Sequence, residues 1–279
     1  MLAYAHQGGA WEWPSSTLFA MRHAVAAGAQ AIELDLHGTS DGHVVVCHDP
    51  TVDRTTDGTG AIAELTLAEV KALDSAYWFI PGADVTVDAP ASAYPYRGRA
   101  ATDPEFTIAT LAEVLEAFPD IILNLDIKQS APEVAPYERA VADLLARFGR
   151  TDDVIVTSFN DATTETFSSY APDVSTSAGT LTTAEFWRAV THDEEPPEMR
   201  AVAFQVPERY EDIVIVDRRF VDAAHRHGVA VHVWTVNDRE SMARLVDLGV
   251  DGVITDVPSE LMTLLNDRGV AWRGPGSDA

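Results

Sequence analysis

Stretches of strand length and stretches of helical period alternate along almost the whole chain. Strands show apolar or alternating residues, whereas helices repeat apolar residues every three to four positions. Strands are predicted at residues 2–6, 31–37, 121–128, 153–159, 174–179, 201–206, 229–236 and 252–256. Helices are predicted at residues 15–28, 66–73, 110–118, 133–148, 161–170, 182–191, 217–227, 238–249 and from 258 onward. Eight strand–helix units predict a closed (β/α)8 TIM barrel, in which the chemistry takes place at the carboxyl ends of the strands.

The second predicted strand carries two acidic residues and runs into a hairpin. In its sequence AIELDLH, alternation places Glu33 and Asp35 on one face and the apolar residues on the other. Asp41-Gly42 favours a two-residue type I′ turn, so pairing outward from the turn would place Asp35 opposite His48. This hairpin would bring two carboxylates close to an imidazole. The alternative is a solvated hairpin face without chemistry.

An irregular stretch interrupts the pattern after this hairpin. Residues 74–107 contain four prolines and several aromatic residues but no sustained helical or strand period. A long irregular segment of this kind is usually functional or forms a cap. We therefore predict a single domain over residues 1–279, with an insertion at about 50–107.

The composition is strongly acidic. Forty-four Asp and Glu residues against 19 Lys and Arg residues give a net charge of −25, which disfavours nucleic acid and anionic membranes as partners. Cys47 is the only cysteine, so no disulfide forms within the chain. The N-terminal sequence has neither a basic start nor a long apolar run, so we expect no signal peptide, no stable membrane insertion and a cytoplasmic protein. The oligomeric state stays open.

Polar and aromatic residues occur near the ends of several predicted strands, and a barrel would bring them to one mouth. They are His6, Glu33, Asp35, Asp126, Lys128, Phe159, Gln205 and Trp234. The three carboxylates form an oxygen-only set that suits one Mg²⁺ or Ca²⁺ ion. Lys128 shares the strand face of Asp126, where it could bind a phosphate oxygen or form a structural salt bridge. His6 and His48 supply two imidazoles, and phosphodiester cleavage needs one group to remove a proton and another to donate one.

Seven stretches carry a family resemblance: AHQGG, GAQAIELDLHGTSDGHVVVCHDPTVDRTT, IATLAEVLEAF, LNLDIK, VIVTSF, VHVWTVND and LGVDGVITDVP. Over nearly its whole length the chain resembles the glycerophosphodiester phosphodiesterases. This family is a metal-dependent, phospholipase C-like barrel with an insertion after the second strand. The resemblance implies that Glu33, Asp35 and Asp126 hold one divalent cation, Mg²⁺ or Ca²⁺. It also implies that His6 and His48 act as general base and general acid.

The resemblance extends to substrate binding. It implies that Lys128 binds phosphate, and that Phe159 and Trp234 shape the organic end of the pocket. Ordinary barrel packing is the alternative for these two rings. Gln7 and Gln205 complete the predicted set of substrate-binding residues.

The chain departs from the family pattern in three places. Gln7 replaces the arginine that usually follows the first histidine, and PSST at residues 14–17 replaces Pro-Glu-Asn-Thr. A glutamine amide offers phosphate fewer donors and no charge. Asp126 replaces the commoner glutamate, as in the branch that resembles lysophospholipase D enzymes. Arg54 could partly replace the missing arginine, a surface arginine being the alternative.

The expected function is metal-dependent hydrolysis of glycerophosphodiesters, or of related small-molecule diesters, to an alcohol and a phosphomonoester. Two alternatives stay open. One is a lysophospholipase D-like hydrolase in which Tyr77, Trp78 and Phe79 of the insertion form an acyl-facing wall. The other is a barrel that binds diesters without cleaving them, because Gln7 stands in place of arginine.

Overall fold

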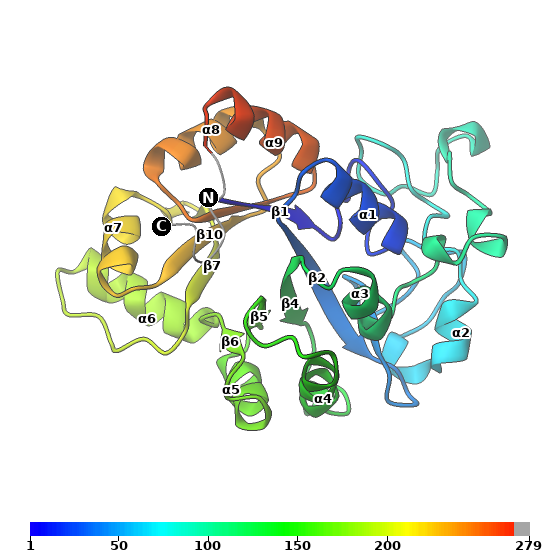
Figure 1. Cartoon of the computed structure of the whole chain (residues 1–279), viewed down its shortest axis with the longest axis horizontal. Coiled ribbons are helices and arrows are strands. Elements are labelled where there is room, and N and C mark those ends of the chain that lie inside the picture. The colour runs from blue at the N-terminus through cyan, green and yellow to red at the C-terminus, as the bar shows by residue number, and fades with distance from the viewer. Residues whose placement is uncertain (271–279) are drawn as a thin grey trace.

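Eight parallel strands form the barrel that the sequence predicts (Figure 1). The computed structural model describes residues 1–270. The barrel strands are β1 (Leu2–His6), β2 (Ala31–Gly38), β4 (Ile122–Ile127), β5 (Val154–Thr157), β6 (Ser175–Thr176), β7 (Ala203–Pro207), β10 (Ala230–Trp234) and β11 (Gly252–Thr255). The short strands outside the ring are β3 (Val44–Val46), β8 (Arg209–Tyr210) and β9 (Ile213–Val214). The ring order is β6-β5-β4-β2-β1-β11-β10-β7, and a parallel bridge between Ser177 and Ala203 joins its two ends. The TIM barrel is thus confirmed, and β6 and β7 lie across the ring from β1 and β2.

Helices cover the outside of the barrel (Figure 1). They are α1 (Leu18–Ala26), α2 (Leu67–Lys71), α3 (Leu111–Ala117), α4 (Glu138–Phe148), α5 (Asp161–Tyr170), α6 (Thr180–Thr191), α7 (Arg218–Arg226), α8 (Arg239–Leu248) and α9 (Pro258–Asp267). The Thr17 hydroxyl caps α1 by accepting a backbone hydrogen bond, so this helix begins three residues later than predicted. α4 begins at Glu138 rather than at residue 133, because Pro136 disfavours helical geometry at the residue before it.

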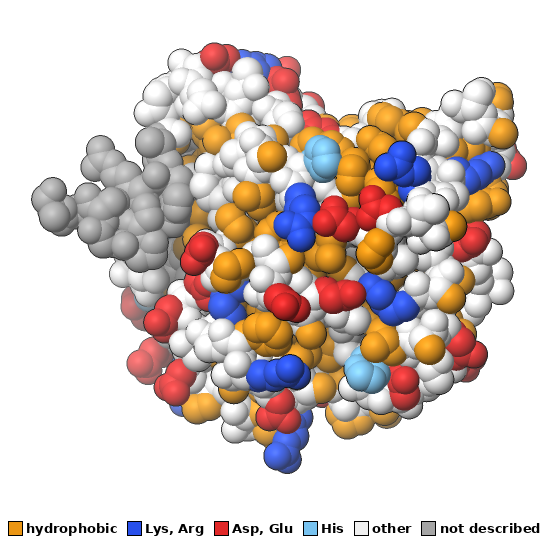
Figure 2. All heavy atoms as spheres, turned by 45° about the vertical axis from the view of Figure 1, so that its right-hand side comes forward, with side chains coloured by type: hydrophobic (Ala, Val, Ile, Leu, Met, Phe, Trp, Pro, Cys, Tyr) orange, Lys and Arg blue, Asp and Glu red, His pale blue; other side chains and the backbone are white. Residues whose placement is uncertain are grey.

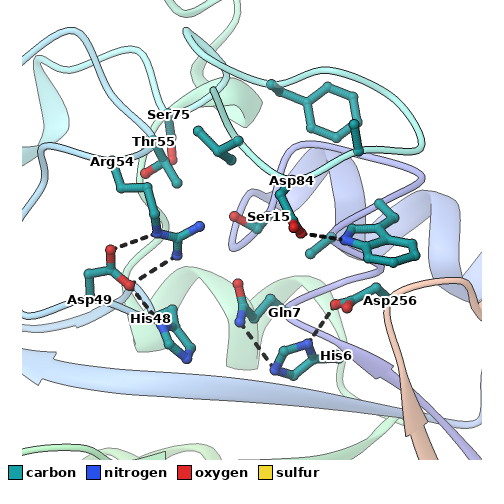
Figure 3. A pocket seen from close by; sticks show the side chains of 15 residues that line it. His6, Gln7, Ser15, His48, Asp49, Arg54, Thr55, Ser75, Asp84 and Asp256 are labelled. Carbon is teal, nitrogen blue, oxygen red and sulfur yellow. Dashed lines mark hydrogen bonds and ion pairs between the residues drawn. The ribbon is translucent and has the colours of Figure 1, made fainter. Parts of the chain in front are cut away.

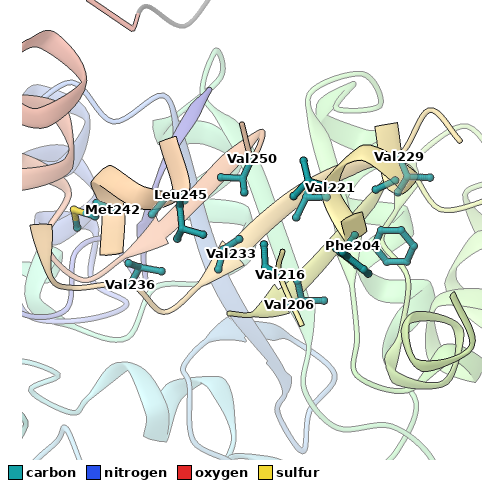
Figure 4. Packing of buried hydrophobic residues seen from close by; sticks show 14 of the residues in the cluster. Phe204, Val206, Val216, Val221, Val229, Val233, Val236, Met242, Leu245 and Val250 are labelled. Atoms are coloured by element: carbon teal, nitrogen blue, oxygen red, sulfur yellow. The ribbon is translucent and has the colours of Figure 1, made fainter. Parts of the chain in front are cut away.

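The strand side chains divide into an outer apolar set and an inner set that becomes polar toward the barrel mouth. Outward-facing residues of β7 and β10, such as Phe204 and Val233, pack against α7 and α8 in a buried cluster (Figure 4). Inside the barrel, Tyr4 packs on the buried His232 ring at 5.0 Å between centroids. Gly252 leaves room for this pair, because a Cβ atom there would lie 2.8 Å from each ring. Apolar packing therefore holds the helices to the barrel and leaves the inner face for polar groups.

The hairpin after β2 is present, but its register differs from the prediction by one residue. The loop contains residues 40–42 instead of two residues. Gly42 adopts a φ of +84°, the left-handed conformation that suits a three-residue hairpin loop. Asp35 consequently lies opposite Cys47, whose N–H donates to the Asp35 carbonyl at 3.0 Å. The predicted pairing of Asp35 with His48 is wrong, and His48 lies one position beyond.

The segment between β3 and α3 contains α2 and four short 3₁₀ helices, namely η1 (Ile62–Glu64), η2 (Ala91–Ala93), η3 (Arg99–Ala101) and η4 (Pro104–Phe106). Several of its aromatic rings pack around one cation. The Arg97 guanidinium lies 4.4 Å from the ring centroid of Tyr77 and 4.5 Å from that of Trp78. The Tyr94 ring lies 3.8 Å from the same guanidinium, and Phe79 is buried. Two of the three rings expected to face an acyl chain therefore stack on Arg97 within the insertion.

Charged side chains of both signs are dispersed over one face of the molecule (Figure 2). On the face shown in Figure 2, Lys and Arg side chains lie among Asp and Glu side chains and form no continuous basic area. Among residues 1–270, no helix is long and apolar enough to cross a membrane.

Candidate active site

Three neighbouring strands bring the predicted acids and one histidine together. In the parallel registers, His6 of β1 lies beside Glu33 of β2, and Asp35 of β2 lies beside Asp126 of β4. The residues between them on β2 and β4 are apolar and pack against the outer helices, so alternation directs the polar side chains to the barrel interior. Adjacent strands thus assemble four of the predicted residues at one end of the barrel.

The three carboxylates form a buried cluster with Lys128. Lys128 Nζ lies 3.2 Å from Asp35 Oδ1 and 3.3 Å from Asp126 Oδ2. Burial raises the pKa of Asp126 to about 7, against its attraction to Lys128. Burial, and then repulsion from Asp35 and Asp126, raises the pKa of Glu33 well above its usual value. Burial opposes the charge of Lys128, but the two aspartates outweigh it and raise the pKa of the amine. One positive charge thus faces three carboxyl groups.

The carboxylate cluster retains unpaired oxygen atoms. Asp35 Oδ2 and Asp126 Oδ1 are buried and have no hydrogen-bond partner in the structure, which is costly for ionised groups. Together with Glu33 they provide the oxygen donors that Mg²⁺ and Ca²⁺ prefer. Within residues 1–270, no group of three or more His, Cys, Asp and Glu side chains is arranged for metal binding, and Lys128 contacts both aspartates instead. The donor types therefore fit a hard cation, while the cation itself stays a prediction.

His6 is held by a partner that the sequence reading missed. Its Nδ1 lies 2.6 Å from Asp256 Oδ1. Because a carboxylate only accepts, Nδ1 carries the proton and Nε2 becomes the acceptor for the Gln7 amide at 3.1 Å. Asn237 Nδ2 donates to Asp256 Oδ2 at 2.7 Å, and Asn237 Oδ1 accepts from the Asp256 N–H at 2.9 Å. The sequence did contain a signal for this partner. Asp256 stands at the end of the last strand, and barrel closure places that strand beside β1.

His48 is held in a similar way by Asp49. His48 Nδ1 lies 2.7 Å from Asp49 Oδ1, and Arg54 donates to both Asp49 oxygens, from Nε at 2.6 Å and from Nη2 at 3.0 Å. The His48 hydrogen bond, followed by the bonds from Arg54, holds the pKa of Asp49 well below its usual value. The ring centroids of His6 and His48 are 6.4 Å apart, at an interplanar angle of 82°. Two imidazoles, each anchored through Nδ1, therefore face the same space (Figure 3).

A cavity of about 250 Å³ lies beside the two histidines, where the insertion approaches β1 (Figure 3). Besides the histidines and their aspartates, its polar lining residues are Gln7, Ser15, Arg54, Thr55, Ser75 and Asp84. Trp11 and Phe79 add aromatic walls. The Trp11 indole donates to Asp84 at 3.1 Å, which links the β1 loop to the insertion. Arg54 lines this cavity while it is bound to Asp49, so a guanidinium is present here although Gln7 replaces the family arginine.

The remaining predicted residues divide between the mouth and the barrel interior. The Phe159 and Trp234 rings meet at 5.7 Å, and Lys128 Nζ lies 5.5 Å from the Phe159 ring centroid. The Phe159 side chain is 57% exposed, so this residue is not part of the core. Gln205 exchanges two amide hydrogen bonds with Asn124, at 2.8 and 3.0 Å. Its side chain is therefore paired inside the barrel, and its role as a substrate ligand stays a prediction.

Comparisons with known proteins agree with this arrangement. The family model described as "Glycerophosphoryl diester phosphodiesterase family" matches residues 6–260. The chain is 31% identical to a glycerophosphodiester phosphodiesterase of Caldanaerobacter subterraneus subsp. tengcongensis, over 96% of this chain and 99% of that protein. It is 25% identical to a lysophospholipase D of Homo sapiens, over 94% of this chain and 85% of that protein.

Solved structures share the fold. A phosphodiesterase of Oleispira antarctica, solved in complex with the product sn-glycerol-3-phosphate, superposes with a TM-score of 0.70 at 23% identity, over 95% of this chain and 97% of that one. The family match, the 31% identity and the common fold lead to one conclusion. The chain belongs to the glycerophosphoryl diester phosphodiesterase family and is a phosphoric diester hydrolase.

Proposed function

We propose that this chain hydrolyses glycerophosphodiesters to an alcohol and a phosphomonoester with one divalent cation, using His6 as general base and His48 as general acid. The observation that carries the proposal is the facing pair of imidazoles beside the carboxylate cluster. Each ring is anchored through Nδ1 to its own aspartate, Asp256 or Asp49. Anchoring through Nδ1 leaves Nε2 of each ring for proton transfer, which is the requirement for acid and base on two sides of one phosphorus.

Glu33, Asp35 and Asp126 are the residues that would hold the cation. The unpaired buried oxygens of Asp35 and Asp126 support this assignment, and oxygen donors suit Mg²⁺ and Ca²⁺ equally. When bound, a divalent cation supplies Lewis-acid stabilisation of negative charge on the phosphoryl oxygens. Lys128 adds a second positive charge at the same place, because it is held there by Asp35 and Asp126.

The two histidines would move the protons. Water attacks phosphorus directly, or a substrate hydroxyl attacks first and water then opens the resulting cyclic phosphate to the phosphomonoester. In either case His6 Nε2 accepts the proton of the attacking oxygen after the Gln7 amide turns away from that atom. Asp256 stabilises the imidazolium that forms. The bond between phosphorus and the leaving oxygen breaks, and His48 donates a proton to the departing alcohol. Asp49 and Arg54 keep His48 oriented through this step.

A specific observation also keeps a lysophospholipase D-like activity in view. The exposed Phe159 ring lies beside Lys128 and could contact an apolar substituent of the substrate. A human lysophospholipase D is among the similar proteins. The reaction is the same in both cases, since water cleaves a phosphodiester. The two activities differ only in whether the glycerol carries an acyl chain.

The main proposal is tested with purified chain on a panel of glycerophosphocholine, glycerophosphoethanolamine and glycerophosphoglycerol, with Mg²⁺, with Ca²⁺ and with EDTA. We expect alcohol release that EDTA abolishes and that His48→Ala lowers by about 10²–10⁴-fold. His225→Ala is the matched control, because His225 also pairs with an aspartate, Asp251, at 2.8 Å. His225 lies on α7, outside the cavity, so its loss should leave the rate unchanged. Full activity in EDTA or in His48→Ala would contradict the mechanism, and binding of intact diester without cleavage would support the non-catalytic alternative.

A further inference from the structure

The cavity beside the two histidines has more acidic than basic side chains in its wall. Its acids and its arginine are Asp49, Asp84, Asp256 and Arg54. Arg54 is paired with Asp49, and Asp256 is hydrogen-bonded to His6. Asp84 forms no ion pair with a lysine, arginine or histidine of residues 1–270, and its hydrogen bond comes from a neutral indole. One carboxylate of the cavity is therefore left without a positively charged partner.

The indole beside this carboxylate belongs to Trp11, which makes three hydrogen bonds. Its Nε1 donates to Asp84 Oδ1 at 3.1 Å. The backbone N–H of Trp11 donates to the Asp256 carbonyl at 3.2 Å, and the Trp11 carbonyl accepts from the Gly82 N–H at 2.6 Å. Trp11 thus joins the insertion to the strand end that anchors His6. The ring and the carboxylate are therefore held in place before a substrate binds, which lowers the entropic cost of binding.

Two aromatic residues and a small volume complete this part of the cavity. Trp11 and Phe79 both line it, and aromatic faces attract ammonium groups, quaternary ones included. In Figure 3, Asp84 extends from the insertion toward Gln7 and His6. The cavity volume of about 250 Å³ lies below the roughly 300–1,000 Å³ of pockets that hold drug-sized ligands. The cavity therefore suits a small head group.

We propose that this cavity selects diesters whose alcohol is a small cation, such as choline or ethanolamine, and that Asp84 and Trp11 bind its ammonium group. This inference rests on the proposed function. A short ethylene link joins the ammonium group of these alcohols to the ester oxygen, so the cation can lie in the cavity while that oxygen lies beside the histidines. Lys128 is held by Asp35 and Asp126 to receive the phosphate. A neutral alcohol such as glycerol gains no Coulomb energy from the unpaired carboxylate.

Asp84 and Trp11 act on binding and take no part in proton transfer. The bonds that form and break at phosphorus are the same for a cationic and for a neutral alcohol. The ammonium group contacts its partners both in the bound substrate and in the transition state. Uniform binding of this kind lowers KM and leaves kcat nearly the same, so the selectivity should appear in KM.

The test compares glycerophosphocholine with its neutral isostere, the glycerophosphodiester of dimethylbutanol in which carbon replaces the ammonium nitrogen, and measures release of glycerol phosphate. For the wild-type chain we expect kcat/KM to be about tenfold higher for glycerophosphocholine. Asp84→Asn keeps the size of the side chain and an acceptor for the indole, and should lower this ratio to about twofold. Trp11→Leu should lower it about threefold. Asp88→Asn is the matched control, because Asp88 is an exposed acid of the insertion outside the cavity, and it should keep the wild-type ratio.

Binding separates this inference from the proposed function. Calorimetry on His48→Ala should show tighter binding of glycerophosphocholine than of the neutral isostere, and adding Asp84→Asn should remove most of the difference. A chain that cleaves neither diester but keeps this binding preference would contradict the proposed function and support the cation site. Equal cleavage of both diesters by the wild-type chain would overturn the cation site and keep the proposed function. An equal loss of the ratio in Asp88→Asn and Asp84→Asn would also overturn it, because the net charge of the chain would then explain the preference.

Discussion

The two sides of the barrel mouth differ in what they expose. On the side of β1 and β2, the insertion forms one wall of the cavity, and the histidines there are hydrogen-bonded to aspartates. Across the ring, β5, β6 and β7 lead into segments that expose apolar side chains, among them Phe159, Leu181 and Tyr210. Figure 1 shows the insertion and β7 on opposite sides of the barrel. The difference teaches that the groups fixed for proton transfer lie on one side of the mouth only.

The largest expected effect comes from the partner of His6. Asp256→Ala should lower kcat by about 10²-fold, because Nδ1 loses the carboxylate that fixes its proton and stabilises the imidazolium. The loss should be equal for glycerophosphocholine and for lysophosphatidylcholine, since the proton transfers are common to both substrates. Asp256→Asn should lose at least as much, because Asn237 Nδ2 donates to one side of this group and would turn the new amide donor toward His6 Nδ1. An unequal loss between the two substrates would show that the two sides of the mouth are not independent.

The next largest effect is on the free energy of unfolding, which should depend on pH through the carboxylate cluster. Burial raises the pKa of Asp126 from 3.8 to about 7, so the folded chain binds more protons than the unfolded chain between these values. Stability must then fall as pH rises through this window, because ionised Asp126 is costly when folded. Relative to wild type, Asp126→Asn should therefore gain about 2 kcal/mol of unfolding free energy between pH 5 and pH 8.

This change is measured by urea denaturation with EDTA present. Saturating Mg²⁺ or Ca²⁺ should reduce the difference in unfolding free energy between Asp126→Asn and wild type, since a cation would stabilise the ionised carboxylate. Asp143→Asn is the control, because Asp143 is an exposed residue of α4. A difference that is independent of pH would contradict the pKa assignment.

A smaller effect is expected from restoring the family residue at position 7. Gln7→Arg should raise kcat/KM for glycerophosphocholine about tenfold, because a guanidinium binds phosphate bidentately and would also free His6 Nε2 from the amide. Gln7→Met removes the donor and serves as the comparison. An unchanged rate in Gln7→Arg would show that Arg54, which lines the same cavity, already supplies the required charge.

The smallest effect concerns packing within the insertion. Arg97→Met removes a guanidinium that stacks on Tyr77 and Tyr94 and donates to the Tyr77 carbonyl at 3.0 Å. We expect a loss of about 1 kcal/mol in unfolding free energy and faster proteolysis within the insertion. Arg99→Met, at an exposed residue with one ring contact, should change little.

Local patterns in the sequence were sufficient for the barrel and for much of the site. Alternation on β2 and β4 placed Glu33, Asp35 and Asp126 inside because a strand side chain has only two directions. The hairpin register was wrong by one residue, since two- and three-residue loops share the signal Asp41-Gly42. In a hairpin, one extra loop residue shifts every cross-strand pair.

Only the tertiary structure decided which side chains are partners. His6 and Asp256 stand 250 positions apart and meet because the barrel closes β11 against β1. Tyr77, Trp78 and Tyr94 of the insertion pack on Arg97, which no periodicity could indicate. Sequence determines the direction of each side chain relative to its own strand, whereas contacts between distant strands depend on how the whole ring packs.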